Sequence, residues 1–187
     1  LALGAMGVAV LAYAVSPVLA HCGKCAGDCK EIVKAMEAGK QTAASMITAA
    51  EAASKGKAVG MNASLDKGKA AVEVIVMVGD KTQSVAVGSD GKTGKPEDAK
   101  SVSADVGKAM DAGKMTANKV IEAAEAHSKG KALAMVASAT AGKASYEVYA
   151  VADGKLQKVK VDDTGKATGM EEAKALPGED KPKPKGG

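Results

Sequence analysis

The sequence lacks arginine, phenylalanine and tryptophan, and it has only three tyrosines among its 187 residues. All 26 basic side chains are therefore lysines, which lack the planar fork that reads guanine edges and grips phosphates in two places. There are also almost no rings on which nucleic-acid bases could stack. With a net charge of only +4, these absences argue against nucleic acid as a partner.

The sequence also lacks the motifs of common enzyme classes. We find no His-Glu-x-x-His zinc-peptidase motif, no phosphate-binding Gly-x-x-x-x-Gly-Lys-Ser/Thr loop and no Gly-x-Ser-x-Gly nucleophile elbow in the mature chain. Only two histidines are present. We therefore expect a protein that is not an enzyme. Its 46% hydrophobic and 26% charged residues are typical of a globular chain, with a core built from aliphatic side chains and methionine.

Residues 1–20 contain no charged side chain and end in Ser16-Pro17-Val18-Leu19-Ala20. Small Ala20 and branched Val18 fit the positions before a signal-peptidase cut between Ala20 and His21. The segment predicts a signal peptide and an exported protein, periplasmic or extracellular, without strong membrane binding after cleavage. The alternative is an uncleaved anchor, since 20 uncharged residues are long enough to span a bilayer.

A cysteine-rich segment follows at residues 21–33. It holds four candidate ligands for a metal ion, namely His21, Cys22, Cys25 and Cys29. Three thiolates and an imidazole suit tetrahedral zinc or copper(I). In an exported protein the same cysteines also suit an internal or intermolecular disulfide, and Cys22-Gly-Lys-Cys25 ahead of a helix suits thiol redox chemistry. The residues alone leave these readings open.

An internal duplication organises the rest of the chain. Ala35-Met36-Glu37-Ala38-Gly39-Lys40 recurs at Ala109-Met110-Asp111-Ala112-Gly113-Lys114, an offset of 109 − 35 = 74 residues, and about half of the positions aligned at this offset are identical. The duplication predicts two repeats, at residues 34–95 and 108–176. A linker with a short helix at 96–107 joins them, and a disordered Pro- and Lys-rich tail follows at 177–187.

Each repeat contains the same pattern of elements. Thr42 and Thr116 are candidate N-caps of helices whose apolar residues recur at helical spacing. Three strands follow, of which the second alternates most clearly, and a shorter helix precedes each unit at 28–38 and 103–112. The predicted fold class is α+β, with two tandem copies of a helix (plus a short leading helix) packed on a three-stranded antiparallel β-meander.

The second repeat resembles a PepSY domain. The resemblance rests on the helix beginning Thr116-Ala117, on Tyr146-Glu147-Val148-Tyr149-Ala150-Val151, and on Val159-Lys160-Val161-Asp162 before a Thr-Gly turn. It covers about residues 116–168 and, more faintly, 42–93, where Val72, Gly88 and Asp90 depart from the pattern. PepSY domains occur in propeptides of secreted thermolysin-like metallopeptidases and as free-standing exported proteins.

The resemblance implies a non-catalytic binding module whose protein partner is a secreted metallopeptidase. Tyr149 and Val151 alternate with the inward-facing residues of their strand, so we expect them on the outer face of the sheet. Tyrosine is a favoured interface anchor, which makes these two residues candidates for partner binding. The alternative is that Tyr149 only covers the sheet or packs on the neighbouring repeat.

Overall fold

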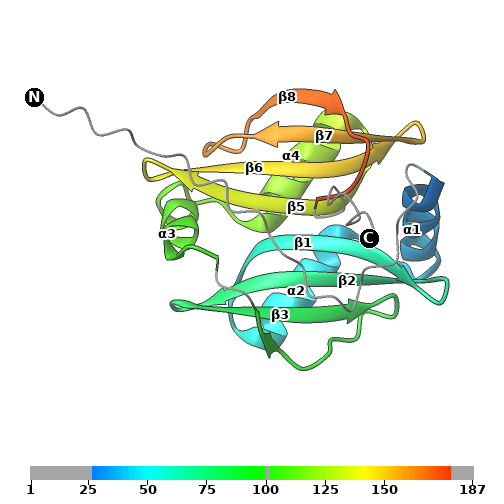
Figure 1. Ribbon diagram of the computed structural model, residues 1–187, viewed down its shortest axis with the longest axis horizontal. Helices are drawn as coiled ribbons and strands as arrows, with labels where there is room; N and C mark the ends of the chain where they lie inside the picture. The colour runs from blue at the N-terminus through cyan, green and yellow to red at the C-terminus, as the bar shows by residue number, and fades with distance from the viewer. Residues whose placement is uncertain (1–26, 100–101, 178–187) are drawn as a thin grey trace, which may run out of the picture.

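The computed structural model describes residues 27–99 and 102–177. Its four helices are α1 (Gly27–Ala38), α2 (Ala43–Ser54), α3 (Ala104–Ala112) and α4 (Ala117–Ser128). Its strands are β1 (Lys57–Asp66), β2 (Lys69–Val78), β3 (Lys81–Gly88), β4 (Glu97–Asp98), β5 (Lys131–Thr140), β6 (Lys143–Ala152), β7 (Lys155–Val161) and β8 (Ala167–Glu172). These eight strands form one antiparallel sheet in the order β4-β3-β2-β1-β5-β6-β7-β8 (Figure 1).

The predicted fold class was wrong about the sheet. Instead of two separate three-stranded meanders, the two repeats share a single eight-stranded sheet, joined where β1 pairs with β5. A lone meander would leave one edge of its first strand with unpaired N–H and C=O groups, and the pairing satisfies these groups on both strands. The prediction also missed β4 and β8, which add to the outer strands β3 and β7.

The junction between the repeats is reciprocal. Met61 lies opposite Met135, its own equivalent at the 74-residue offset, while Asn62 lies opposite Ala134, the equivalent of Gly60. Likewise Gly60 lies opposite Val136, the equivalent of Asn62. The two halves are thus related by an approximate twofold axis that passes between the two methionines. We call the paired strands β1 and β5 the seam.

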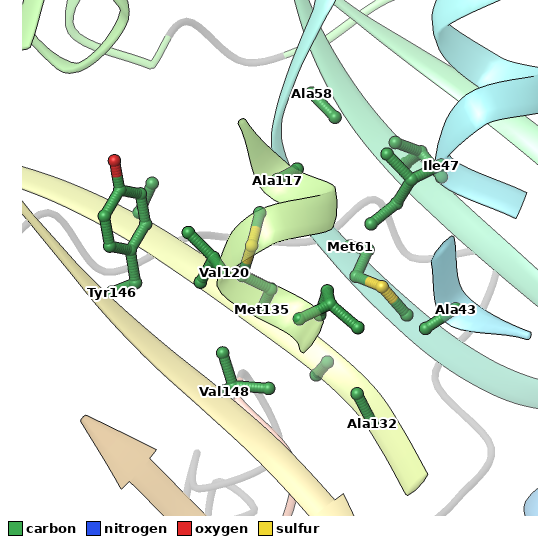
Figure 2. Close-up of a cluster of buried hydrophobic side chains, with 14 of the residues drawn as sticks. Ala43, Ile47, Ala58, Met61, Ala117, Val120, Ala132, Met135, Tyr146 and Val148 are labelled. Carbon is green, nitrogen blue, oxygen red and sulfur yellow. The ribbon is translucent and has the colours of Figure 1, made fainter. Parts of the chain in front are cut away.

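Helices α2 and α4 cover one face of the sheet (Figure 1). Thr42 caps α2 by accepting a hydrogen bond at Oγ1 from the Ser45 N–H at 3.1 Å, and Thr116 caps α4 in the same way, so both N-cap predictions are confirmed. The buried side chains of the two helices pack on the sheet, as the close-up in Figure 2 shows around Met61 and Met135. This aliphatic layer is the core that a chain poor in aromatics must build.

The seam strands lack the alternation typical of a sheet with one solvated face. In β1 the run Ala58, Val59, Gly60 and Met61 is buried throughout, and in β5 so is the run Ala132, Leu133, Ala134 and Met135. Each run includes a bulge, between Ala58 and Gly60 or between Ala132 and Ala134. Helices α1 and α3 lie to either side of the central strands in Figure 1 and contact strands of both repeats. The middle of the sheet is therefore covered more completely than its flanks.

The chain returns across the sheet after each outer strand. The Ala99 N–H donates to the Thr82 carbonyl at 3.0 Å, and the Ala173 N–H donates to the Leu156 carbonyl at 2.9 Å, at equivalent positions of the two repeats. The apolar residues that follow, Val102 and Leu176, are both buried in the core cluster. These returning segments extend each repeat beyond the predicted three strands.

Candidate functional site

The predicted metal ligands fall mostly outside the described residues. His21, Cys22 and Cys25 precede residue 27, as does the predicted signal peptide. Cys29 lies on α1 and is only 7% exposed, packed in the core cluster with Ile32 and Met36. Within residues 27–99 and 102–177, no three His, Cys, Asp or Glu side chains gather as a metal site would require. A zinc, copper or thiol-redox site at residues 21–29 stays a prediction.

Tyr149 and Val151 lie on the face of the sheet opposite α2 and α4, because their neighbours Val148 and Ala150 point into the core. Both side chains are half-buried and pack against the edge of the core cluster. Tyr149 lies opposite Lys158 on β7 in the strand register. The structure thus places the two predicted partner-binding residues on the outer face, and whether they bind a partner stays a prediction.

A charged network lies beside Tyr149. The Lys158 ammonium is 2.7 Å from Oε1 of Glu171 and 3.6 Å from Oε1 of Glu147, so it joins residues of β6, β7 and β8. The hydrogen bond to Glu171 raises the pKa of Lys158, and the same bond lowers the pKa of the Glu171 carboxyl. Lys158 and Glu171 therefore stay charged at neutral pH.

A cavity of about 270 Å³ opens where α1 and the start of α2 face the start of β5. Four apolar side chains contribute to its lining: Val33, Met36, Ala43 and Ala132. Charged side chains also line it: Glu37, Lys40, Glu125 and Lys131. Lys131 lies opposite Val151 in the strand register, so one lining residue of the cavity is a direct strand neighbour of a predicted partner-binding residue. The size and mixed lining suit an apolar group that carries a charge at one end.

Glu125 has a structural role within this lining. Its Oε1 accepts a hydrogen bond from the Ala132 N–H at 2.8 Å, and Glu51 accepts one from the Ala58 N–H at 2.9 Å in the other repeat. Both bonds satisfy a buried backbone donor beside the bulge of a seam strand. The repetition of this glutamate in the two halves therefore reflects the need to satisfy the bulge.

At the equivalent place in the other half of the molecule, the two corresponding side chains form an ion pair. There Lys57, the equivalent of Lys131, contacts Asp111, the equivalent of Glu37. Among the described residues, Glu37 and Lys131 make no such pair. Met115 also stands where Gln41 lines the open cavity. The twofold arrangement is thus broken at this position, and two opposite charges stay available at the mouth of one cavity.

Among the described residues, three buried side-chain polar atoms have no hydrogen-bond partner: Oδ1 of Asn62, Oδ1 of Asn118 and the hydroxyl of Tyr146. Tyr146 is 1% exposed, and within the described part of the chain its hydroxyl makes no hydrogen bond. In Figure 2 the hydroxyl points away from the other labelled side chains. Burial, with a smaller contribution from the charge of Asp163, raises the pKa of Tyr146 to about 12. The first repeat has Val72 at this position, so the hydroxyl is not needed for the fold.

Comparison with known proteins adds little to this description. No model of a known protein family matches the sequence, and neither does any curated protein. Among solved structures, the chain is similar to one described as a "putative lipoprotein" from Clostridium difficile 630, with 12% sequence identity and a TM-score of 0.38. The alignment covers 63% of this chain and 83% of that one. A likeness this distant carries no argument about function.

A helix that spans a bilayer needs about 20 predominantly apolar residues. None of those within residues 27–99 and 102–177 is long and apolar enough to cross a bilayer.

Proposed function

We propose that this protein is a non-catalytic, exported binding module that holds a protein partner at the cavity between α1 and β5 and on the adjoining outer face. The observation that carries the proposal is the difference between the two halves: one Lys–carboxylate pair is formed, and its equivalent at the cavity mouth is not. Export rests on the uncharged residues 1–20 and on Val18 and Ala20 before the expected cut.

The cavity supplies the two components that peptide recognition needs. Val33, Met36 and Ala132 offer an apolar surface for a partner side chain, and burying such a side chain contributes about 1.5–3 kcal/mol. The ammonium group of Lys131 can pair with a carboxylate of the partner, and the carboxylate of Glu37 can pair with an ammonium group of the partner. Charged groups placed in this way select the partner and fix its orientation more than they add affinity.

The outer face beside the cavity extends the proposed surface. Tyr149 supplies an aromatic anchor with few rotatable bonds, held next to the Lys158–Glu171 pair. In the first repeat the equivalent of Tyr149 is Ile75, and Glu73 accepts a hydrogen bond from Ser84 at 2.5 Å in place of the charged network. Of the two outer faces, we therefore assign that of the second repeat to partner contact, together with the cavity that α1 and α2 line.

The resemblance to PepSY domains supports a co-exported metallopeptidase as the partner. The test is to measure binding and inhibition of a thermolysin-like metallopeptidase by the full chain purified from an exporting host. We expect Lys131→Ala and Tyr149→Ala each to weaken binding at least tenfold. Lys57→Ala is the matched change in the half where the ion pair is formed. It should leave binding unchanged because the exposed Lys57–Asp111 pair contributes little to stability.

Two results would count against the proposal. If the chain neither binds nor inhibits any metallopeptidase of a panel, the assigned partner class is wrong. If Lys57→Ala and Lys131→Ala weaken binding equally, the difference between the two halves does not mark the binding site, and the cavity has no special role.

A further inference from the structure

The two outer edges of the sheet are built differently, although the residues that form them are equivalent in the duplication. Strand β8 has six residues, whereas β4 has only two, Glu97 and Asp98. The equivalent of Met170 in the centre of β8 is Pro96, and the equivalent of Gly169 is Lys95. Proline cannot donate to a strand ladder, and lysine is a common guard against edge pairing. The first repeat therefore has a blunted edge, and the second has a regular one.

The backbone of β8 offers hydrogen-bonding groups along its open side. Because the Ala173 N–H donates to Leu156, the alternation of an antiparallel ladder directs Glu171 and Gly169 toward β7 as well. The N–H and C=O groups of Met170 and Glu172 then face the open edge. Among the described residues, Met170 is the one large hydrophobic side chain that is exposed, at 49%. Within residues 27–99 and 102–177, an apolar residue is thus centred on a strand edge that no other strand pairs with.

We propose that β8 pairs with β8 of a second copy of this chain, antiparallel and with Met170 opposite Met170. This register places Gly169 opposite Glu171 and Thr168 opposite Glu172, so no two like charges lie directly opposite each other. The acidic side chains are moreover matched within each copy, since Lys158 lies 2.7 Å from Glu171 and Lys155 lies 3.6 Å from Glu172. The edge is therefore self-complementary in both shape and charge.

The seam within the chain provides a precedent for this pairing. It also joins two antiparallel edges about a facing pair of methionines, Met61 and Met135. Helix α4 packs over β6 and β7, with β5 on one side of it and β8 on the other. Pairing at β8 would therefore place a second α4 across the new junction much as α2 lies across the seam. The core layer would continue past Met170 into the second copy.

The blunted edge at β4 explains why such pairing stops at two copies. A chain with two open edges would add copies at both ends and form a fibre, whereas a single open edge closes into a twofold dimer. Pro96 and Lys95 remove the second edge. The choice of a second copy as the partner of β8 rests on this one-sided blunting together with the self-complementary register.

The test is the mass of the full chain in solution, measured by analytical ultracentrifugation from 1 to 200 μM. We expect a monomer–dimer equilibrium without larger species. The double change Gly169→Lys, Met170→Pro, which copies the blunted edge into β8, should weaken dimerisation at least tenfold. Met170→Lys provides a second variant that keeps the backbone N–H in case the proline disturbs folding, which circular dichroism would reveal.

The matched control is Pro96→Ala, just before β4, which should leave the dimerisation constant unchanged. Hydrogen exchange locates the contact, since the Met170 and Glu172 amides should become protected as the concentration rises. A wild-type chain that remains monomeric at 200 μM, or a dimer that persists in both β8 variants, overturns the proposal. So does a monomer whose β8 amides become protected only when an extended peptide is added. The proposal is independent of peptidase binding, which the Lys131 variants test separately.

Discussion

The two repeats share their elements, their caps and their seam, but they differ on the outer face of the sheet and at its outer edge. The first repeat has a Glu73–Ser84 hydrogen bond on its outer face, a proline just before its outer strand β4 and no exposed large hydrophobic side chain within its described residues. The second has Tyr149 in a charged network and Met170 on an open edge. The two halves thus keep the same fold and differ in the side chains of their outer surfaces.

The largest expected effect concerns the glycines that end α1 and α3. A Cβ on Gly39 would lie 2.0 Å from the Ser89 carbonyl oxygen, whereas a Cβ on Gly113 would lie 2.8 Å from that of Asp163. We expect Gly39→Ala to lower the free energy of unfolding by about 3 kcal/mol and Gly113→Ala by about 1–2 kcal/mol, because backbone must move in both cases and further in the first. Urea unfolding measures the difference, and Gly94→Ala, where the nearest atom is 3.6 Å away, is the control.

The next prediction tests the symmetry of the seam. Glu51→Ala and Glu125→Ala should each lower the free energy of unfolding by about 1–3 kcal/mol, because a buried N–H beside a bulge loses its acceptor. The conservative changes to glutamine keep an acceptor oxygen and should recover most of this loss. Unequal losses in the two halves, beyond about 1 kcal/mol, would mean that the cavity near Glu125 relaxes the structure around Ala132.

Removing the unpartnered hydroxyl should stabilise the second repeat. Tyr146→Phe is expected to raise the free energy of unfolding by about 1 kcal/mol, since no hydrogen bond is lost and a buried polar group is removed. Thermal unfolding at pH 7 checks this. A lower melting temperature in the variant would show that the hydroxyl has a partner in solution.

The same residue predicts a pH dependence. The pKa of Tyr146 is about 12 in the folded protein, against 10.0 for a tyrosine outside a folded structure. The unfolded chain therefore releases this proton first, so the contribution of Tyr146 is complete below pH 10 and is lost as the pH rises toward 12. The wild-type protein should lose stability over this range more steeply than Tyr146→Phe, measured by urea unfolding at each pH.

The smallest effect should come from the Lys57–Asp111 ion pair. Asp111→Ala should change the free energy of unfolding by less than about 0.5 kcal/mol, because both side chains of the Lys57–Asp111 pair are exposed to solvent. The more informative variant is Glu37→Asp, which shortens the carboxylate of the open half to match Asp111. If this variant lowers partner binding while stability is unchanged, the unformed pair at the cavity is what the partner uses.

Local signals in the sequence predicted the helices and the meander strands well. Thr42 and Thr116 are caps in the structure as expected, and the apolar spacing that follows them marks the buried sides of α2 and α4. The outer-face position of Tyr149 and Val151 followed from alternation alone. These features depend on neighbouring residues, which is why a single sequence contains them.

The joined sheet depends on residues far apart in the chain, and the predicted fold class missed it. A signal was present, since the unbroken buried runs at 58–61 and 132–135 are typical of central strands covered on both faces. Strands β4 and β8 lack strong apolar alternation, so only their pairing with β3 and β7 defines them. The cavity depends on whether Glu37 and Lys131 meet, which composition and spacing do not determine.

The reciprocal register at Met61 and Met135 also suggests how the chain arose. The register is symmetric about Met61 and Met135, so two identical copies of one repeat could pair through the same strand edge with no change in sequence. Fusing two such copies into one chain would make the pairing intramolecular and raise the effective concentration of one half for the other. Each half could then accumulate its own differences. Asn62 now faces Ala134, whereas in two identical copies of the first repeat it would face Gly60 of the other copy.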